Sequence, residues 1–171
     1  MNGPGKEYPM DMKQATLALI VRGDQLLLGL KKRTAEIGGD TLNGPGGKVD
    51  PGETTNECVV RETQEEVGLA IDVTDEDLRA VITFHNGAAS VWRVYVYLVT
   101  SFHGEPSDTD DMWASPVWWH SKDKLPFHRM LASDKEWIPH VLDGGRFNLQ
   151  VYQNDNASEL LQSPVFEPFA A

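Results

Sequence analysis

Three glutamates lie close together near the middle of the chain, at Glu62, Glu65 and Glu66. On a helix, Glu62 and Glu66 lie one turn apart on one face, and Glu65 lies on the neighbouring row. Like charges at this spacing repel each other, so the cluster needs a positively charged partner. Mg²⁺ prefers oxygen ligands and is usually shared with substrate phosphates. The spacing therefore indicates a site for a divalent cation and a phosphate-bearing ligand, although a solvated acidic helix would explain the charges alone.

The residues around the glutamates predict a loop that leads into a capped helix. Three glycines and a proline between Gly46 and Gly52 are typical of a loop. Thr54 and Glu57 have the spacing of a capping box, and Gly68 stands where a left-handed residue ends a helix. A plain acidic helix accounts for none of these features. One stripe of the helix is suited to face a core, at Val59, Val60, Thr63 and Val67.

At these residues the sequence resembles the Nudix box, the signature of the Nudix hydrolases. The match consists of Gly47, five residues, Glu53, seven residues and then Arg61 to Leu69. Thr63 departs from the family, which usually has an aliphatic residue there, and a small packing cost is expected. The resemblance implies an αβα sandwich with a mixed sheet, and Mg²⁺ as cofactor with Mn²⁺ as a substitute. It assigns metal binding and catalysis to Glu62, Glu65 and Glu66, a further metal contact to the Gly46 carbonyl, and structural roles to Gly47, Glu53, Arg61 and Gly68.

From residue 16 to residue 152 the chain is similar to the MutT-type branch of the family, which hydrolyses oxidised purine nucleoside triphosphates. The resemblance implies cleavage of a triphosphate such as 8-oxo-dGTP to the monophosphate and pyrophosphate, which sanitises the nucleotide pool. Three positions depart from the branch: Ser133 replaces an aspartate, Leu131 a tryptophan and Pro45 an aromatic residue. Carried over by position, Asp111 matches an extra metal ligand, and the substrate-binding positions are Thr16, Lys31, Asn43, Pro45, Gly46, Gly47, Lys48, Leu131 and Asp134.

Two polar features before the box allow two interpretations on residue type alone. Lys31, Lys32 and Arg33 are suited to bind phosphate, but they also fit an ordinary charge cluster on an edge strand. Asn43 is suited to read a base edge, but asparagine beside glycine more often forms a local turn. The residues themselves leave both questions open.

Other activities are compatible with an intact box. The same chemistry would serve a dinucleoside polyphosphate, a nucleoside diphosphate sugar, ADP-ribose or a capped RNA end. A non-catalytic Nudix module that only binds a ligand or a protein is a further alternative. Such a module predicts a damaged box, whereas all the metal-binding glutamates are present here. We therefore expect a hydrolase.

The composition restricts the partners of the protein. A formal net charge of −11 argues against duplex nucleic acid and against a membrane surface. A single nucleotide stays compatible, because bound metal inverts the local sign of the charge. Cys58 is the one cysteine, so no internal disulfide is possible, and its position within the helix favours a small buried hydrophobe. With no apolar run long enough to span a bilayer, we expect a cytoplasmic monomer.

The chain of 171 residues suits one domain with one core. We expect a flexible arm at residues 1–14, the Nudix domain at residues 15–152 and a weakly ordered extension at residues 153–171. The predicted strands form a hairpin (15–21 and 25–30), a long antiparallel pair (78–85 and 91–102), a short strand (117–120) and a last strand (147–152). A second helix is expected from Ser133 or Asp134 to Leu142. Together these elements indicate an α+β sandwich.

Overall fold

The computed structural model describes residues 11–36, 38–109 and 112–170. The α-helices in these residues are α1 (Thr55–Val67) and α2 (Asp134–Leu142). Short 3-10 turns lie at Asp75–Asp77, Lys122–Lys124 and Phe127–Arg129. The strands, in chain order, are β1 (Lys13–Arg22), β2 (Gln25–Leu30), β3 (Leu42–Asn43), β4 (Ala70–Ile71), β5 (Leu78–Asn86), β6 (Ser90–Val99), β7 (Phe102–His103), β8 (Trp118–Ser121), β9 (Phe147–Gln153) and β10 (Val165–Pro168).

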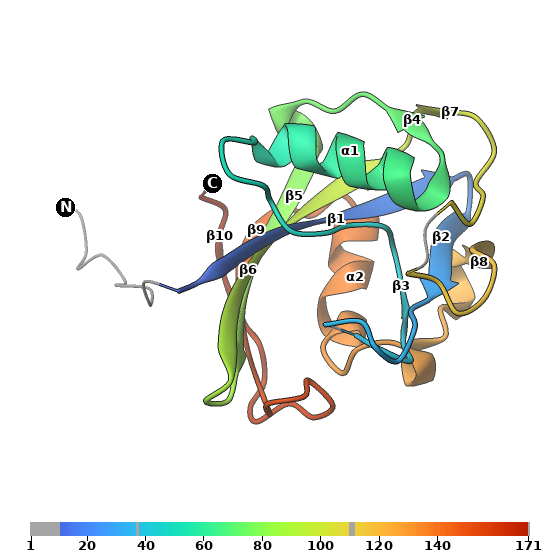
Figure 1. The fold of residues 1–171 in the computed structure, drawn as a ribbon. Helices are drawn as coiled ribbons and strands as arrows, with labels where there is room; N and C mark the ends of the chain where they lie inside the picture. Colours follow the sequence, from blue (N-terminus) through green and yellow to red (C-terminus); the bar gives the residue numbers. More distant parts are fainter. Residues whose placement is uncertain (1–10, 37, 110–111, 171) are drawn as a thin grey trace.

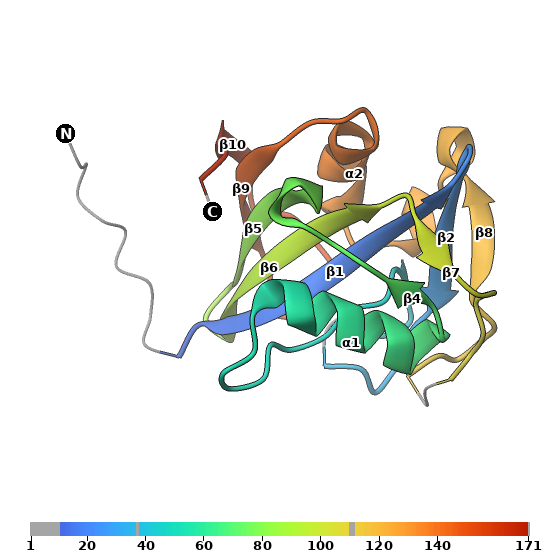
Figure 2. The same ribbon diagram turned by 90° about the horizontal axis from the view of Figure 1, so that it is seen from above.

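A mixed sheet separates the two helices. Its strand order is β10-β9-β5-β6-β1-β2-β3, with β8 added to β2. The pairs β1–β6 and β5–β9 are parallel, and the remaining pairs of this sheet are antiparallel. In Figure 1, α1 lies above the central strands and α2 below them, and Figure 2 shows the same separation from above. The predicted α+β sandwich with a mixed sheet is confirmed.

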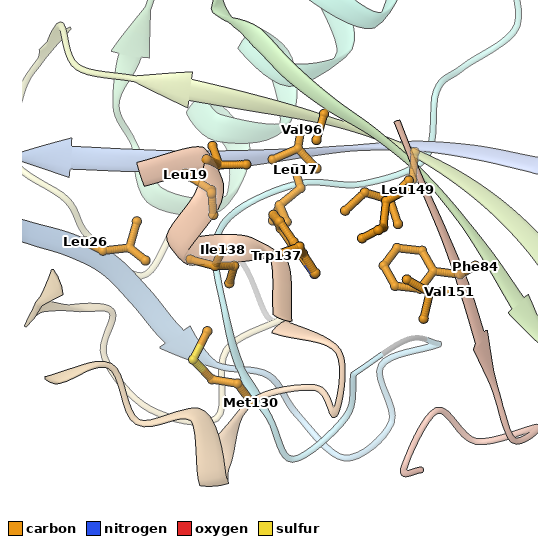
Figure 3. Packing of buried hydrophobic residues seen from close by; sticks show 14 of the residues in the cluster. Leu17, Leu19, Leu26, Phe84, Val96, Met130, Trp137, Ile138, Leu149 and Val151 are labelled. Carbon is orange, nitrogen blue, oxygen red and sulfur yellow. The ribbon is translucent and has the colours of Figure 1, made fainter. Parts of the chain in front are cut away.

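Strand β1 shows how the sheet divides the core. Successive side chains of a strand point to opposite faces. Accordingly Leu17 and Leu19 belong to the core cluster that surrounds α2, whereas Ala18 and Ile20 belong to the cluster beneath α1. Figure 3 shows the first cluster, in which the side chains of α2 meet those of the strands. Full burial of such an aliphatic or aromatic side chain stabilises the fold by roughly 1.5–3 kcal/mol.

Helix α1 begins and ends where the sequence predicts. Thr54 and Glu57 form the capping box: the Glu57 N–H donates to Thr54 Oγ1 (3.1 Å), and the Thr54 N–H donates to the Glu57 carboxylate (2.9 Å). Gly68 ends the helix with a left-handed φ of 71°, a conformation that glycine adopts without strain. Of the predicted apolar stripe, Val59, Thr63 and Val67 are buried and Val60 is half-buried. This anchorage fixes the adjoining face of the helix, which carries Glu62 and the buried Glu66.

The loop before α1 is attached along β1 in place of a strand. The β1–β2 hairpin pairs Val21 with Leu26 and Arg22 with Gln25, next to its turn. Farther from the turn, backbone N–H groups of β1 donate to the glycine loop instead. These bonds join Thr16 N to Gly47 O and Ala18 N to Pro45 O, both at 2.8 Å, and Val49 N of the loop donates to Gln14 O at 3.0 Å. The loop is therefore fixed to β1 by backbone hydrogen bonds and by an isolated bridge between Ala15 and Lys48.

Two stretches differ from the sequence prediction. The strand expected at residues 91–102 ends at Val99, and β7 instead pairs with β4 in a separate two-stranded sheet. Residues 153–171, expected to be weakly ordered, contain β10, which pairs with β9. Aromatic packing explains this strand, because the Phe166 ring lies 5.0 Å from that of Phe147 and 5.1 Å from that of His140, between ring centroids. The division into arm, domain and extension stays a prediction.

No helix in the described part of the chain is long and apolar enough to cross a membrane.

Candidate active site

Residues from both helices and from five strands line one cavity of about 360 Å³. Glu62 and Glu66 come from α1, which packs against β1, whereas Asn86 and Gln153 come from β5 and β9, on the far side of β6. The cavity therefore extends across the sheet from an acidic end to an amide-bearing end. Its lining also includes Ala15, Thr16, Leu17, Lys31, Glu36, Asn43, Gly44, Gly46, Gly47, Lys48, Ile82, Phe84, Trp92, Val94, Val96, Met112, Leu131, Asp134 and Trp137.

The three glutamates of the box have different surroundings. Glu66 is 2% exposed, and its Oε2 accepts a hydrogen bond from the Gly46 N–H at 3.3 Å. Glu62 is half-buried and lies against Gly47, where an added Cβ would come within 2.5 Å of the Glu62 carboxylate. The Glu65 side chain is 54% exposed and is not part of the lining. Two carboxylates therefore face the cavity, and the third lies at its rim.

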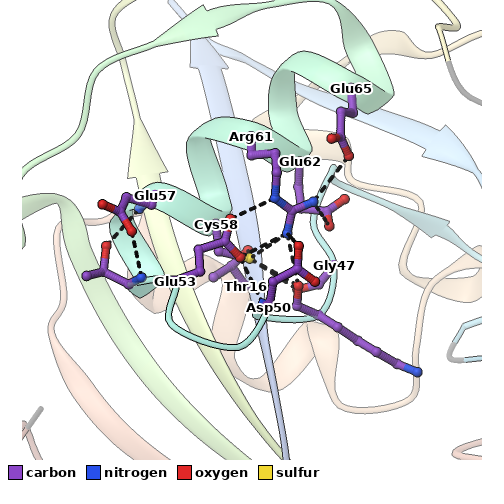
Figure 4. Close-up of polar contacts among 11 residues, drawn as sticks. Thr16, Gly47, Asp50, Glu53, Glu57, Cys58, Arg61, Glu62 and Glu65 are labelled. Atoms are coloured by element: carbon purple, nitrogen blue, oxygen red, sulfur yellow. Dashed lines mark hydrogen bonds and ion pairs between the residues drawn. The ribbon is translucent and has the colours of Figure 1, made fainter.

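Arg61 connects these carboxylates to the loop before the helix (Figure 4). Its Nε donates to Glu53 Oε1 at 2.7 Å, and its Nη1 donates to Glu62 Oε1 at 2.7 Å and to Glu65 Oε2 at 3.2 Å. The hydrogen bond from Arg61 lowers the pKa of Glu53 to about 2, so Glu53 stays ionised as a support for the loop. Burial raises the pKa of Glu62, against the effect of the Arg61 hydrogen bond. Glu53 and Arg61 therefore link the loop to the helix, and the roles expected of them stay predictions.

The donor set is suited to a hard divalent cation. The three glutamates offer only oxygen atoms, which Mg²⁺ and Mn²⁺ accept as ligands. Within the described residues, no three His, Cys, Asp or Glu side chains are close enough together to hold a metal. Arg61 explains part of this geometry, because its guanidinium draws Glu62 and Glu65 to itself. Asp111, the expected extra ligand, lies outside the described residues.

Two lysines, Lys31 and Lys48, line the cavity. Lys31 lines the cavity, and burial lowers its pKa, while the charges of Glu66, Asp134 and Glu62 raise it again. Lys48 also lines the cavity, and its Nζ lies 2.5 Å from Glu36 Oε2. The second oxygen of Glu36 accepts from Lys13 Nζ at 2.7 Å, and both ammonium groups lie over the Trp92 ring.

Asn43 and Asp134 supply polar groups to the cavity, whose lining also includes apolar side chains such as that of Trp137. The Gly44 N–H donates to Asn43 Oδ1 at 2.9 Å, which fixes the orientation of this buried amide. Asp134 is 2% exposed and accepts a hydrogen bond from the Leu131 N–H at 3.1 Å. Burial raises the pKa of Asp134 to about 7, although the Leu131 hydrogen bond and the Lys31 charge favour the ionised form. This carboxyl group therefore titrates near neutral pH.

The titration of Asp134 predicts a pH-dependent stability. Because the pKa rises from 3.8 to about 7 on folding, the neutral carboxyl group is favoured in the folded state. Its contribution is complete below pH 4 and is lost as the pH rises to about 7, by on the order of 2 kcal/mol after allowance for coupling to Lys31. Urea midpoints at pH 5 and pH 8, in the presence of EDTA, measure this loss. Asp134→Asn should reduce the difference between the two midpoints, and an equal difference in variant and wild type would contradict the assignment.

Not every predicted site residue lines the cavity. Pro45 does not, and its carbonyl instead accepts a hydrogen bond from Ala18 N at 2.8 Å. Thr16 does, and its Oγ1 lies 3.3 Å from the Cys58 sulfur. Burial raises the pKa of Cys58 to about 11, so the thiol stays protonated, as expected for a buried hydrophobe rather than a nucleophile. The remaining predicted substrate residues all belong to the lining.

Residues of β5, β6 and β9 line the cavity, which we did not predict from the sequence. The signal lay in the two-residue alternation of the predicted strands. On β5, Asn86 follows Ile82 and Phe84 on one face, and on β9, Gln153 follows Leu149 and Val151. When a polar residue follows apolar residues on the buried face of a strand, it needs a hydrogen-bond partner there, either another side chain or a ligand.

Comparison with known proteins agrees with this geometry. The family model described as NUDIX domain matches residues 12–141, and the chain therefore belongs to the Nudix family. It is 37% identical to the "Oxidized purine nucleoside triphosphate hydrolase" of Danio rerio over 79% of this chain and 83% of that protein. The identity to the Mus musculus protein of the same name is 33%, over 77% of this chain and 81% of that one. The fold is also similar to the crystal structure of a MutT protein from Bacillus halodurans, with a TM-score of 0.76 and 25% identity over 93% of this chain and all of that one.

Proposed function

We propose that the protein is a hydrolase that cleaves nucleoside triphosphates to the monophosphate and pyrophosphate, with oxidised purine nucleotides such as 8-oxo-dGTP as substrates. One observation carries the proposal: a single cavity joins the carboxylates of Glu62 and Glu66 to a compartment that contains Asn43 and Asp134. The names of the zebrafish and mouse relatives support the same substrate class.

The metal assignment belongs to this proposal. Glu62, Glu65 and Glu66, with the Gly46 carbonyl and Asp111, would hold Mg²⁺, for which Mn²⁺ would substitute. Bound there, the ion would offset phosphate charge and make a water molecule more acidic. Movement of Glu65 from the rim is then required, and its side chain would give up the hydrogen bond from Arg61 Nη1, which measures 3.2 Å.

The residues of the chain would position the phosphates and accept the proton. Lys31 and Lys48 would offset phosphate charge, which is the main requirement of phosphoryl transfer. Water would attack phosphorus and break its bond to the bridging oxygen, so that pyrophosphate leaves with the electron pair of that bond. The proton of the water would go to a carboxylate of the glutamate cluster, or to Asp111.

The base compartment retains the means to hold a purine despite its departures from the MutT-type branch. Leu131 offers no aromatic surface, and Ser133 is buried without an aspartate's charge. Trp92 and Trp137 line the cavity, however, and supply aromatic rings near the polar groups. Asp134 in its neutral form has both a donor and an acceptor, which matches the mixed donor and acceptor edge of an oxidised purine. The substrate is then a free nucleotide, and the monomeric state and cytoplasmic location stay predictions.

A substrate panel tests the proposal. Cleavage is followed by chromatography of the nucleotide products for 8-oxo-dGTP, 2-hydroxy-dATP, the unmodified triphosphates, ADP-ribose and a dinucleoside polyphosphate, with Mg²⁺ and with EDTA. For the triphosphates, pyrophosphate release is measured as well. We expect Mg²⁺-dependent release that is fastest with an oxidised purine. Equal rates on plain triphosphates would indicate a broader pocket, and a lack of cleavage of every compound would contradict the proposed function.

A further inference from the structure

At the β5–β9 end of the cavity, two amide side chains are hydrogen-bonded to each other, and one of their oxygen atoms has no donor among the described residues. Asn86 and Gln153 face each other in the parallel register of β5 and β9, and both line the cavity. Asn86 is 5% exposed and Gln153 is 1% exposed. The Gln153 Nε2 donates to Asn86 Oδ1 at 2.7 Å, and the Asn86 Nδ2 donates to Ser90 Oγ at 3.1 Å. Gln153 Oε1 has no hydrogen-bond partner among the described residues.

A buried acceptor without a donor is unfavourable in a folded protein. Buried polar groups are nearly always paired, because an unpaired one loses its water without compensation. The relay from Ser90 through Asn86 holds the Gln153 amide in place, so the side chain cannot turn to solvent. In the free protein a water molecule can supply this donor, and a ligand that enters the cavity can replace that water with a donor of its own.

The position of the pair suggests which part of a ligand reaches it. In the strand order β9-β5-β6-β1, three strand spacings separate β9 from β1, which corresponds to about 14 Å. The acidic residues of α1 lie at the β1 end, so phosphates bound there would direct the nucleoside toward the amides. Phe84 and Trp92 line the cavity beside the amides and offer apolar surface for a flat ring.

We propose that Gln153, held by Asn86, is a specificity-determining residue that accepts a hydrogen bond from an N–H group of the bound purine base. Gln153 then adds a further polar contact to those of Asn43 and Asp134 in the same cavity. This inference rests on the proposed function for the nature of the ligand. It adds a recognition group that the resemblance to the MutT-type branch did not indicate.

The relay also allows a second state. If both amides rotate, Ser90 Oγ donates to Asn86 Oδ1, and the Asn86 Nδ2 donates to Gln153 Oε1. Gln153 then presents its Nε2 as a donor to the cavity, because the oxygen and nitrogen of an amide exchange places on rotation. In the first state Gln153 binds a base that presents a donor to it, and in the second state it binds a base that presents an acceptor. The free-energy cost of rotating both amides sets the preference between the two kinds of base.

Binding of nucleoside monophosphates without metal tests the inference separately from turnover. The probes are two pairs that differ by one amino group: GMP and IMP, and AMP and purine riboside monophosphate. Quenching of tryptophan fluorescence reports binding, since Trp92 and Trp137 line the cavity. The wild type should prefer the amino-bearing member of at least one pair, and Gln153→Met should reduce that preference roughly tenfold. Asn86→Ser, which frees the amide of Gln153, should reduce it less.

Gln150→Met is the matched control. Gln150 lies on the same strand, is buried and bonds His85 Nε2 at 2.8 Å, but it does not line the cavity. This variant should leave the preference unchanged. The inference is overturned if folded Gln153→Met and Asn86→Ser keep the wild-type preference. It is also overturned if the wild type shows no preference within either pair, or binds none of the four nucleotides. Loss of pyrophosphate release in the wild type contradicts the proposed function alone, because the binding ratios are measured without metal or turnover.

Discussion

Replacing Glu66 by glutamine is expected to lower kcat/KM for nucleoside triphosphates by at least about 10³-fold, while the protein stays folded. Glu66 is the buried carboxylate of the cavity, and its Oε2 accepts a hydrogen bond from the Gly46 N–H. Glutamine has the same shape and keeps an oxygen for that bond, but it removes the negative charge. Initial rates of pyrophosphate release with Mg²⁺ measure the effect, and thermal unfolding confirms that the fold is kept.

The same substitution at three other glutamates shows whether position or charge matters. Glu62→Gln should resemble Glu66→Gln, because Glu62 also lines the cavity. The box predicts near-complete loss for Glu65→Gln as well, although Glu65 lies at the rim. Glu76→Gln removes one charge from an exposed residue of a 3-10 turn and should leave the rate unchanged. Near-normal turnover by a correctly folded Glu66→Gln variant would refute the catalytic role of this carboxylate.

Adding a methyl group at Gly47 is expected to lower kcat by about 10²-fold with little change in stability. The new Cβ would lie 2.5 Å from the Cδ and Oε1 atoms of Glu62 and 2.7 Å from Oε2, so the carboxylate must move. Glu62 is a side chain at the cavity surface, and it can shift without unfolding the protein. Steady-state kinetics and urea unfolding of Gly47→Ala provide the two readouts.

Two further variants separate displacement of Glu62 from a general effect of alanine. Gly52→Ala is the control: its φ of 79° makes alanine strained, but nothing lies within 4 Å of the added Cβ. It should lower stability by about 1 kcal/mol and leave the rate unchanged. In the Gly47→Ala background, Glu62→Asp shortens the displaced side chain and should cost much less than it does in the wild type. Strict additivity of the two changes would contradict direct contact between the residues.

The sequence was sufficient to predict α1 and the loop before it because their signals are local. The Thr54–Glu57 capping box and the left-handed Gly68 act within one or two turns of the helix, so spacing along the chain determines their contacts. The family resemblance then supplied the sandwich, which the fold confirms.

The rest of the candidate site depends on contacts between distant segments. Gln153 meets Asn86 only because β9 pairs with β5 in parallel, and no local signal in either strand specifies that register. Glu36 reaches Lys13 and Lys48 from a separate loop. The exposure of Glu65 depends on how Arg61 divides its hydrogen bonds among several acceptors. Such features follow from the assembled fold and from competition among partners, which spacing along one segment does not encode.

The attachment of the glycine loop along β1 restricts which part of the enzyme can vary in length. A free surface loop tolerates insertions at a small entropic cost, because only its ends are fixed. Here the carbonyls of Pro45 and Gly47 accept from alternate residues of β1, so one inserted residue would shift the loop out of register. In the preceding segment, residues 32–36 and 38–41, Glu36 is held by exposed ion pairs, which are weak contacts. That segment, which contributes Glu36 to the cavity lining, can therefore change in length more easily than the stretch from Asn43 to the glutamates.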